Sequence, residues 1–240
     1  MEDVKCAVTA PTGLASFIVG EVTIFRLLQL PIEHEGKEAG YWNLSKASQK
    51  YLKTALRKLT VLVIDEVSMV SSPNHTYIHL RLQEIMGGNE WFGGVNVMFV
   101  GDLLQLQPVS GEPIFEKMKR SSMSRKIGGI ASRNIWQEVV TYDELMINER
   151  QKDDKEYSEL LNFVRCGETS EETIRVLETR VIDVPVKDKV AELRSLGKTP
   201  VCLFPTRKQT DAFNEEMLDA QNAEVKVIPC IDEVDETIWH

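Results

Sequence analysis

Two adjacent carboxylates follow an apolar run in the segment TVLVIDEVSMV, at residues 60–70. The run from Val61 to Ile64 is typical of a buried parallel strand, and Asp65 and Glu66 follow it directly. Paired carboxylates at the end of such a strand usually serve a magnesium-bound nucleotide, whose phosphates are held by a glycine-rich loop of the form G-x-x-x-x-G-K-[ST]. The 240 residues contain no loop of this form. The purpose of the acidic pair therefore depends on the rest of the chain.

A second apolar run ends in polar residues of the same kind. VNVMFVGD, residues 95–102, closes on Gly101 and Asp102 and leads into a loop that contains Gln105. Because the carboxyl ends of parallel strands meet at one edge of a sheet, we expect Asp102 and the acidic pair on the same edge. An amide such as Gln105 can both donate and accept hydrogen bonds there. The alternatives are a solvated strand end or a helix-dipole partner for the acidic pair, and a loop glutamine without a role.

The elements that would position these residues alternate along the chain. Runs with strand character are separated by runs at helical spacing, which predicts an α/β fold with a parallel sheet. The predicted order is a strand at 4–10, helices at 14–20, 23–30 and 47–59, the acidic strand, a helix that begins after Ser72-Pro73 and ends before Gly87-Gly88, and a strand at 95–102.

The pattern changes after about residue 148. Helical spacing marks DDKEYSELLNFVRCG and SEETIRVLETR, and a new strand and helix follow in VCLFPTRKQTDAFNEEML. We interpret residues 1–148 as one domain and residues 149–240 as the start of a second α/β domain. The apolar residues of the first of these helices are expected to be core: Leu160, Leu161, Phe163 and Val164.

Composition limits the kinds of protein that this chain can be. With 42% hydrophobic residues it can bury a substantial core, and no apolar run approaches the roughly 20 residues of a membrane span. The N-terminus lacks the features of a signal peptide, so we expect a soluble, intracellular protein without membrane contact. The four cysteines are far apart, which favours reduced thiols and no disulfide partner. The net charge of −9 argues against nucleic-acid binding through overall basicity, so any such contact must be local.

Five segments, taken in order, resemble the motor of the PIF/RecD-type DNA helicases. They are APTGLASFIVGEVTIFRLL, VLVIDEVSMV, FVGDLLQLQPV, INERQKDDKEYSELLNFVRCG and LFPTRKQTDAFNEEML, and they extend over nearly the whole chain. Those helicases are superfamily-one enzymes that use ATP and Mg²⁺ to translocate 5′ to 3′ on single-stranded DNA. The resemblance implies a RecA-like parallel-sheet motor domain that lacks its first strand and phosphate loop, followed by the start of a second RecA-like domain.

The resemblance also implies roles around the nucleotide. Asp65 would hold hydrated Mg²⁺, and Glu66 would polarise the attacking water as general base. Gln105 would contact the γ-phosphate or its water and report the nucleotide state to the DNA groove. The family pattern G-D-x-x-Q-L-P-P-V has a proline where this chain has Gln107, so the turn is expected to be looser here.

Arg150, in the segment NERQ, resembles the arginine that reaches across the cleft to the γ-phosphate in this family. The alternative is a surface arginine that pairs with Glu149 or Asp153, because such pairs are common and contribute little to stability.

Two turns resemble the DNA-contacting motifs of the family. Pro11-Thr12-Gly13 would offer backbone amides and a hydroxyl to a DNA phosphate. The family continues with T-I-H-S, where this chain has Thr23-Ile24-Phe25-Arg26, and Phe25 could stack on a base or fill the core. Pro205-Thr206-Arg207 resembles the matching turn of the second domain, although a helix start capped by Thr206 explains it nearly as well.

Two other features are interpreted as structural. His75 and His79 are four residues apart on a predicted helix, as zinc ligands can be, but no third ligand motif accompanies them. Trp91 and Trp136 are expected to be anchors near the ends of the sheet.

Two motifs of the family are missing from the sequence. The phosphate loop would precede residue 4, and a second γ-phosphate arginine would lie beyond His240. We expect the phosphate-loop strand beside the acidic strand, so its absence would expose a sheet edge.

Our first hypothesis is an internal piece of such a helicase, acting as a monomer on single-stranded DNA and duplex junctions in repair, recombination or telomere maintenance. A eukaryotic parent would be nuclear or mitochondrial. The alternative is a catalytically inactive single-stranded-DNA-binding module. A third reading, an ATPase of another kind with the same acidic strand, is disfavoured by NERQKDD and Gln105.

Overall fold

The computed structural model describes residues 5–32, 40–117, 134–168, 170–221 and 226. Residue 4 of the first predicted strand and Cys230 lie outside these ranges, and Cys6, Cys166 and Cys202 carry free thiols. Within the described ranges, no helix is long and apolar enough to cross a membrane.

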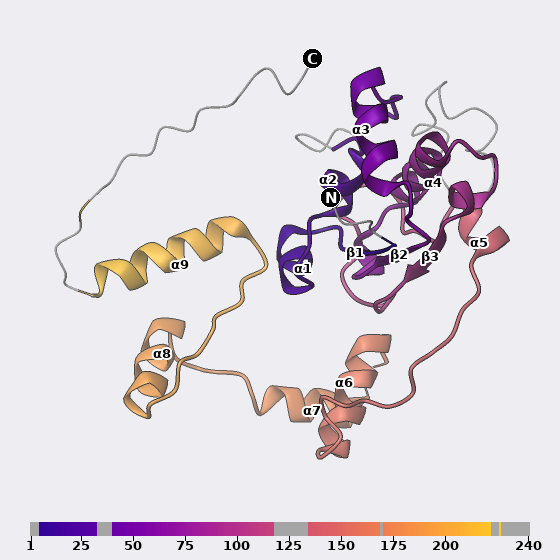
Figure 1. The fold of residues 1–240 in the computed structure, drawn as a ribbon. Helices are drawn as coiled ribbons and strands as arrows, with labels where there is room; N and C mark the ends of the chain where they lie inside the picture. The colour runs from indigo at the N-terminus through magenta and orange to yellow at the C-terminus, as the bar shows by residue number, and fades with distance from the viewer. Residues whose placement is uncertain (1–4, 33–39, 118–133, 169, 222–225, 227–240) are drawn as a thin grey trace. The chain divides into compact units, whose positions relative to one another are not determined.

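Three parallel strands form the sheet, in the order β1-β2-β3 (Figure 1). They are β1, Cys6–Thr9; β2, Val61–Ile64; and β3, Asn96–Phe99. The last residues of the three strands are partners in register, so the residues that follow them meet at one edge of the sheet. The predicted α/β fold with a parallel sheet is confirmed.

The acidic strand β2 lies in the middle of this sheet and pairs with a strand on each side. Both of its edges are therefore hydrogen-bonded, which leaves no room for a phosphate-loop strand beside it. The expected position of that strand is wrong. Among the described residues, the strands with only one partner are β1 and β3.

Helices flank the sheet, and each of the helices α1 to α5 begins after a polar capping residue. They are α1, Gly13–Ile18; α2, Ile24–Leu28; α3, Lys46–Leu56; α4, Ser72–Met86; and α5, Ile135–Val139. Short 3₁₀ helices span Val67–Met69 and Trp91–Gly94. The side chains of the N-cap residues accept a hydrogen bond from a backbone N–H three residues further on: Thr12, Thr23, Ser45, Ser71 and Asn134. These caps explain why α1 to α4 begin close to the positions predicted from the sequence, whereas α5 was not predicted.

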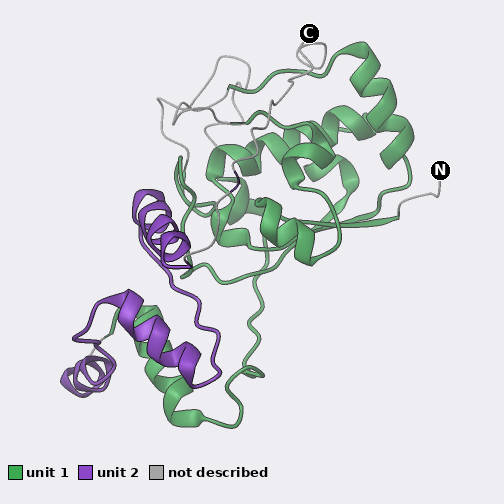
Figure 2. Ribbon diagram, turned by 90° about the vertical axis from the view of Figure 1, so that its left-hand side faces the viewer, with its two compact units in different colours: residues 1–169 green, residues 170–240 purple. Residues whose placement is uncertain are grey.

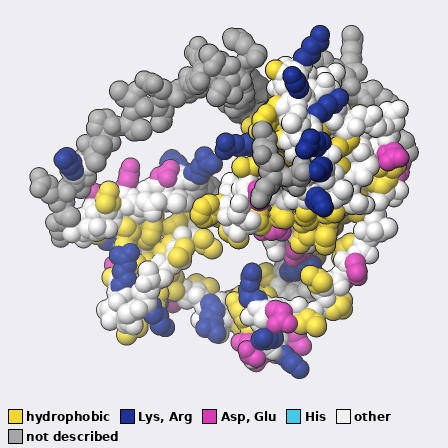
Figure 3. All heavy atoms as spheres, viewed as in Figure 1, with side chains coloured by type: hydrophobic (Ala, Val, Ile, Leu, Met, Phe, Trp, Pro, Cys, Tyr) yellow, Lys and Arg dark blue, Asp and Glu magenta, His cyan; other side chains and the backbone are white. Residues whose placement is uncertain are grey.

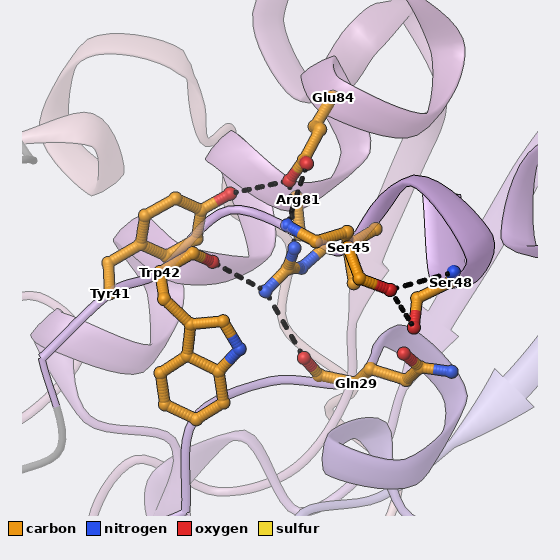
Figure 4. A network of polar contacts seen from close by, with 8 residues as sticks. Gln29, Tyr41, Trp42, Ser45, Ser48, Arg81 and Glu84 are labelled. Carbon is orange, nitrogen blue, oxygen red and sulfur yellow. Dashed lines mark hydrogen bonds and ion pairs between the residues drawn. The ribbon is translucent and has the colours of Figure 1, made fainter. Parts of the chain in front are cut away.

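Helix α4 carries a buried arginine that ties three segments together (Figure 4). Arg81 is fully buried, and its Nη1 lies 2.8 Å from Oε2 of Glu84. Its Nη2 donates to the carbonyl oxygens of Gln29 at 3.2 Å and Trp42 at 3.0 Å. The guanidinium also lies 5.1 Å from the centre of the Tyr41 ring. A buried cation with these partners holds α2 and the segment before α3 against α4.

The two histidines of α4 belong to an aromatic cluster. His75 lies within 5.2 to 6.0 Å of the ring centres of Phe92, Phe99 and Trp136, and burial lowers its pKa to about 3. The Nδ1 of His79 accepts the backbone N–H of Phe92 at 3.0 Å. These histidines are therefore core residues, as the sequence analysis expected.

The chain divides into two compact units, residues 1–169 and 170–240 (Figure 2). Helix α6, Lys155–Cys166, is part of the first unit. The second contains α7, Glu171–Glu178; α8, Val186–Ser195; and α9, Arg207–Asp219. The sequence predicted two RecA-like domains, residues 1–148 and 149–240. That division stays a prediction.

Two expectations for this part of the chain are wrong. The segment after residue 200 is not a strand, because the described part of the second unit contains no strand with which this segment could pair. Its residues Val201 and Leu203 are 84% and 90% exposed. Helix α6 buries none of its side chains, and Phe163 and Val164 are each 44% exposed. Its apolar face therefore lacks the covering layer that makes a helix face core.

Candidate functional site

The turn after β2 holds the acidic pair in an unusual backbone conformation. Oδ1 of Asp65 accepts the N–H of Glu66 at 2.9 Å, and Glu66 itself is left-handed, with φ 52° and ψ 48°. A residue with a side chain adopts this conformation at a cost of roughly 1 kcal/mol or more. The next N–H, of Val67, donates to the carbonyl of Val100 at 3.0 Å, which ties the turn to the end of β3. The strain is thus held in place by the neighbouring strand.

The end of β3 approaches this turn closely at Gly101. Its φ is +136°, and a Cβ at this position would lie 2.9 Å from the nitrogen of Val67 and 3.3 Å from the Cα of Glu66. Both the conformation and the space therefore require glycine. The G-D dipeptide after β3 is needed to place the acidic turn.

Three of the four predicted nucleotide residues, Asp65, Glu66 and Gln105, line one pocket of about 290 Å³. Asp65 and Glu66 come from the turn after β2, Gln105 from the loop after β3, and Thr12 from the turn after β1. The other lining residues are Leu14, Ala15, Ile18, Ser68, Met69 and Leu106. Side chains that are far apart in the sequence therefore meet at the carboxyl edge of the sheet.

The loop of Gln105 is organised around Asp102. The carboxylate of Asp102 accepts the N–H of Leu104 at 3.0 Å. Its carbonyl accepts the N–H of Gln105 at 3.0 Å. Gln107, which stands where the family has proline, donates from Nε2 to the carbonyl of Leu103 at 3.1 Å. The side chain of Gln107 thus closes the turn that proline would otherwise stiffen.

Arg165, from α6, was not recognised in the sequence. Its Nε and Nη2 lie 2.6 and 2.8 Å from the two oxygens of Asp102, in a bidentate pair. Hydrogen bonding from Arg165 is the main reason that the pKa of Asp102 lies below its usual range. Arg165 stands within the segment LLNFVRCG, but no spacing rule connects two residues 63 positions apart. Only the fold could reveal this pair.

The predicted DNA-contacting residues of the first unit lie at the same edge. The hydroxyls of Thr12 and Thr23 accept the N–H groups of Ala15 and Arg26, each at 3.3 Å, so both cap a helix. Thr23 also forms a parallel bridge with Ala10, directly before Pro11. The space around the Cβ position of Gly13 is open to 4 Å.

A second pocket, of about 190 Å³, lies beside these turns and contains Phe25. The other lining residues are Pro11, Thr12, Ile32, Met69, Asn74, Pro108, Val109 and Ser110. Phe25 is also packed against the core, so it fills the core in part while it lines the pocket.

Arg150 is not among the residues that line the nucleotide pocket. It is exposed, and its N–H donates to Oδ1 of Asn148 at 3.1 Å. Glu149, its suggested surface partner, instead pairs with Lys152 at 3.2 Å. Pro205 and Thr206 belong to the second unit, where the hydroxyl of Thr206 caps α9 by accepting the N–H of Gln209 at 3.3 Å.

A groove of about 730 Å³ runs along β3. Asn96, Val97, Met98 and Phe99 form one side, and residues 139–143 also line it. Met98 is 58% exposed although it belongs to an apolar strand. Among the described residues no strand pairs with this edge of β3.

The chain is similar to known proteins in family, sequence and structure. A model of the PIF1-like helicase family matches residues 2–175. The ATP-dependent DNA helicase PIF1 of Saccharomyces cerevisiae is 27% identical over 228 residues, which are 94% of this chain and 24% of that protein. ATP-dependent DNA helicase Pif1 of Bdellovibrio bacteriovorus is 27% identical over 222 residues, 92% of this chain and 45% of that protein.

Solved structures show the same likeness. The Pif1 helicase of Candida albicans superposes with a TM-score of 0.62 at 24% identity, over 93% of this chain and 45% of the other. A Bacteroides Pif1 in complex with ADP-AlF4 gives a TM-score of 0.54 at 26% identity, over 72% of this chain and 39% of the other. The chain thus spans about a quarter to a half of the length of these relatives.

Proposed function

Because the chain belongs to the PIF1-like helicase family, we propose that it is part of an ATP-dependent DNA helicase that couples ATP hydrolysis to 5′-to-3′ translocation on single-stranded DNA and to duplex unwinding. One observation carries the proposal. A single pocket collects Asp65, Glu66, Gln105 and Thr12 from the turns after three neighbouring strands. Phosphoryl transfer to water is catalysed mainly by positioning and charge, and these are the residue types that it requires.

The acidic pair suits Mg²⁺, which binds through one or two carboxylates and keeps several waters. One oxygen of Asp65 is engaged by the N–H of Glu66, and its carboxylate lies at the pocket. Asp65 would hold the ion, which when bound neutralises charge on the phosphates. No cluster of three or more acidic, histidine or cysteine ligands occurs in the described part of the chain, so a site of higher ligand number is not offered there.

The remaining residues would each have a separate role in ATP hydrolysis. Glu66, which lines the pocket beside Asp65, would accept a proton from the attacking water as general base. Gln105, whose backbone N–H donates to the carbonyl of Asp102, would contact the γ-phosphate or that water. Arg150 reaches the γ-phosphate only when the two motor domains close, which agrees with its exposed position outside the pocket.

DNA contacts are proposed at the same edge of the sheet and in the second unit. Pro11, Thr12, Gly13 and Thr23 would bind a DNA phosphate through backbone amides and through hydroxyls that also cap helices. Pro205 and Thr206 would act in the same way at the start of α9. The partners would be single-stranded DNA and duplex junctions, bound by a monomer. Repair, recombination or telomere maintenance would be the setting, in the nucleus or mitochondrion of a eukaryote.

The groove along β3 suggests where a phosphate-loop strand would lie. It follows the unpaired edge of β3 and is also lined by residues 139–143. A parallel strand in this position would complete the sheet and end at the same edge as the pocket. The 240 residues do not contain the loop itself.

The test of the proposal is the Glu66→Gln substitution in a parent protein that includes the phosphate loop. Loss of the base should abolish ATP turnover, while ATP binding persists because the amide keeps the shape of the carboxylate. Glu21→Gln, at an exposed position, is the control and should leave both unchanged. Retained turnover in Glu66→Gln would remove Glu66 as the base.

The missing phosphate loop favours one alternative, a catalytically inactive module that binds single-stranded DNA. It predicts salt-dependent binding of single-stranded DNA by the purified chain without nucleotide. Absence of binding at low salt rules this alternative out.

A further inference from the structure

Helix α3 carries a row of exposed basic side chains. Lys46, Lys50, Lys53 and Arg57 follow one another at intervals of four, three and four residues, which places them on one face of the helix. All four are exposed, and the row is about 16 Å long at the helical rise per residue. Lysine and arginine side chains gather in a line over α3 in Figure 3. The opposite face of the helix, with Leu52 and Leu56, is buried.

The helix itself contains no acidic residue. Between Glu38 and Asp65 the chain has five lysines and arginines and no aspartate or glutamate, although its net charge is −9. Among the described residues, no carboxylate pairs with Lys46, Lys50 or Lys53. Other helices of the chain do balance their charges, as Lys189 with Glu192 and Arg175 with Glu171 show.

The stability of α3 does not explain this pattern. Like charges four residues apart on a helix repel each other, as do Lys46 with Lys50 and Lys53 with Arg57. Lys46 also occupies the first turn, where the helix dipole favours acidic residues. A row of cations that weakens its own helix indicates a polyanionic partner.

Two aromatic side chains accompany the row. Tyr51 is 60% exposed and follows Lys50 directly, about 100° around the helix. Trp42 is 44% exposed, and Arg81 holds its backbone through the carbonyl oxygen. Its ring extends away from the Arg81 network (Figure 4). Exposed rings beside cations suit unpaired bases, which stack on aromatics while the backbone phosphates meet the cations.

We propose that the outer face of α3 binds single-stranded nucleic acid, with Lys46, Lys50 and Lys53 on the phosphates and Tyr51 stacked on a base. This surface lies on the helix that precedes β2, and it is separate in sequence from the turns at the carboxyl edge of the sheet. It adds to the proposed helicase function a second contact for the strand. The contact needs neither the nucleotide pocket nor ATP.

Salt dependence of binding tests the charged part of the proposal. Binding of a fluorescent oligothymidylate to the full chain is measured without nucleotide over a range of salt concentrations. The slope of log K against log salt is negative, and changing Lys46, Lys50 and Lys53 together to Gln should reduce its magnitude by about 2, since each phosphate contact on a single strand contributes about −0.7. The variant should melt no earlier than the unmodified chain, because like-charge repulsion is removed.

A matched control removes the same charge elsewhere. Changing Lys187, Lys189 and Lys198, in the second unit, to Gln should leave the slope unchanged. An equal fall in both triple variants would show a net-charge effect and overturn the proposal. An unchanged slope in the α3 variant would overturn it as well, while leaving the proposed contacts at the sheet edge standing.

Stacking is tested separately at Tyr51. Tyr51→Leu should weaken binding about tenfold with no change in slope, and Tyr51→Phe should bind like the unmodified chain, because the ring and not the hydroxyl stacks. Tyr157→Leu, at a tyrosine that is 50% exposed on α6, is the control. Equal affinity for a duplex and a single strand, together with no effect of Tyr51→Leu, would overturn the assignment to single strands.

Discussion

Single residues decide the geometry of the acidic turn. Glu66 is held in a left-handed conformation, and the strand end beside it approaches so closely that only a glycine fits at position 101. Strain of this kind persists where the surrounding structure determines it, as it does here through the hydrogen bond from Val67 to Val100. The position of the proposed general base therefore depends on a residue without a side chain.

Gly101→Ala should destabilise the chain by about 2 to 4 kcal/mol, because the new Cβ meets both an unfavourable φ and the nitrogen of Val67. The free energy of unfolding in urea measures the effect. Gly20→Ala is the matched control, since Gly20 has a φ of +79° and open space around its Cβ position. It should cost about 1 kcal/mol. Equal costs at the two positions would contradict the close approach at Gly101.

The pair of Arg165 and Asp102 predicts a pH dependence. The pKa of Asp102 is lowered in the folded state, so its contribution to stability is present at neutral pH and is lost as the pH falls through the folded pKa. Arg165→Gln should therefore lower the free energy of unfolding by about 1 kcal/mol or less near pH 7, given that the pair is partly exposed. The difference should disappear well below about pH 4, the ordinary pKa of aspartate.

Chemical denaturation at several pH values measures this difference. Arg175→Gln serves as the comparison, because it removes an exposed ion pair with Glu171. If the loss of unfolding free energy in Arg165→Gln were the same from neutral to acidic pH, the titration of Asp102 would not be its cause.

At the scale of elements, buried polar contacts hold the helices that frame the sheet. Arg81 joins α4 to the ends of two other segments, and Glu84 also accepts the N–H of Leu44 at 2.8 Å and the hydroxyl of Tyr41 at 3.2 Å. The segment before α3 thus takes its position from α4. These contacts therefore position the helix that carries the basic row and the exposed ring of Trp42 (Figures 3 and 4).

Arg81→Met should cost about 3 to 5 kcal/mol, because it leaves the carbonyl oxygens of Gln29 and Trp42 without this donor and the carboxylate of Glu84 without its cation. Thermal unfolding followed by circular dichroism is the measurement. Arg175→Met, at an exposed pair on α7, should change the stability by less than about 1 kcal/mol. A small effect at Arg81 would mean that water replaces its partners.

At the scale of the whole molecule, the sheet is open along β3. The groove of about 730 Å³ exposes apolar strand residues, and an exposed edge of a parallel sheet is rarely left uncovered. The proposed phosphate-loop strand would cover it. The chain spans 24% of the yeast relative and 45% of the Bdellovibrio relative, so further sequence is available in such proteins.

The groove predicts that an upstream extension that carries the phosphate-loop strand raises the melting temperature of the chain. The gain comes from apolar burial and from new hydrogen bonds along β3. An extension of equal length, with prolines at positions that must donate to β3, is the control and should have no effect. Equal melting temperatures for both extensions would show that the groove is not the place of the strand.

The sequence by itself determined the local structure and the kinds of chemistry. Apolar runs predicted β1, β2 and β3, and helical spacing with proline and glycine signals predicted α1 to α4, because these signals act between residues that are close in the chain. The residue types at the strand ends, and their order along the chain, were enough to indicate the family.

Only the tertiary structure decided which strand lies in the middle, that Phe163, Val164, Val201 and Leu203 remain exposed, and that Arg165 meets Asp102. The order of parallel strands depends on how separate segments pack across the sheet, and no local pattern records it. The pair of Arg165 and Asp102 joins residues 63 positions apart, and their attraction depends on distance in space and not on spacing in sequence.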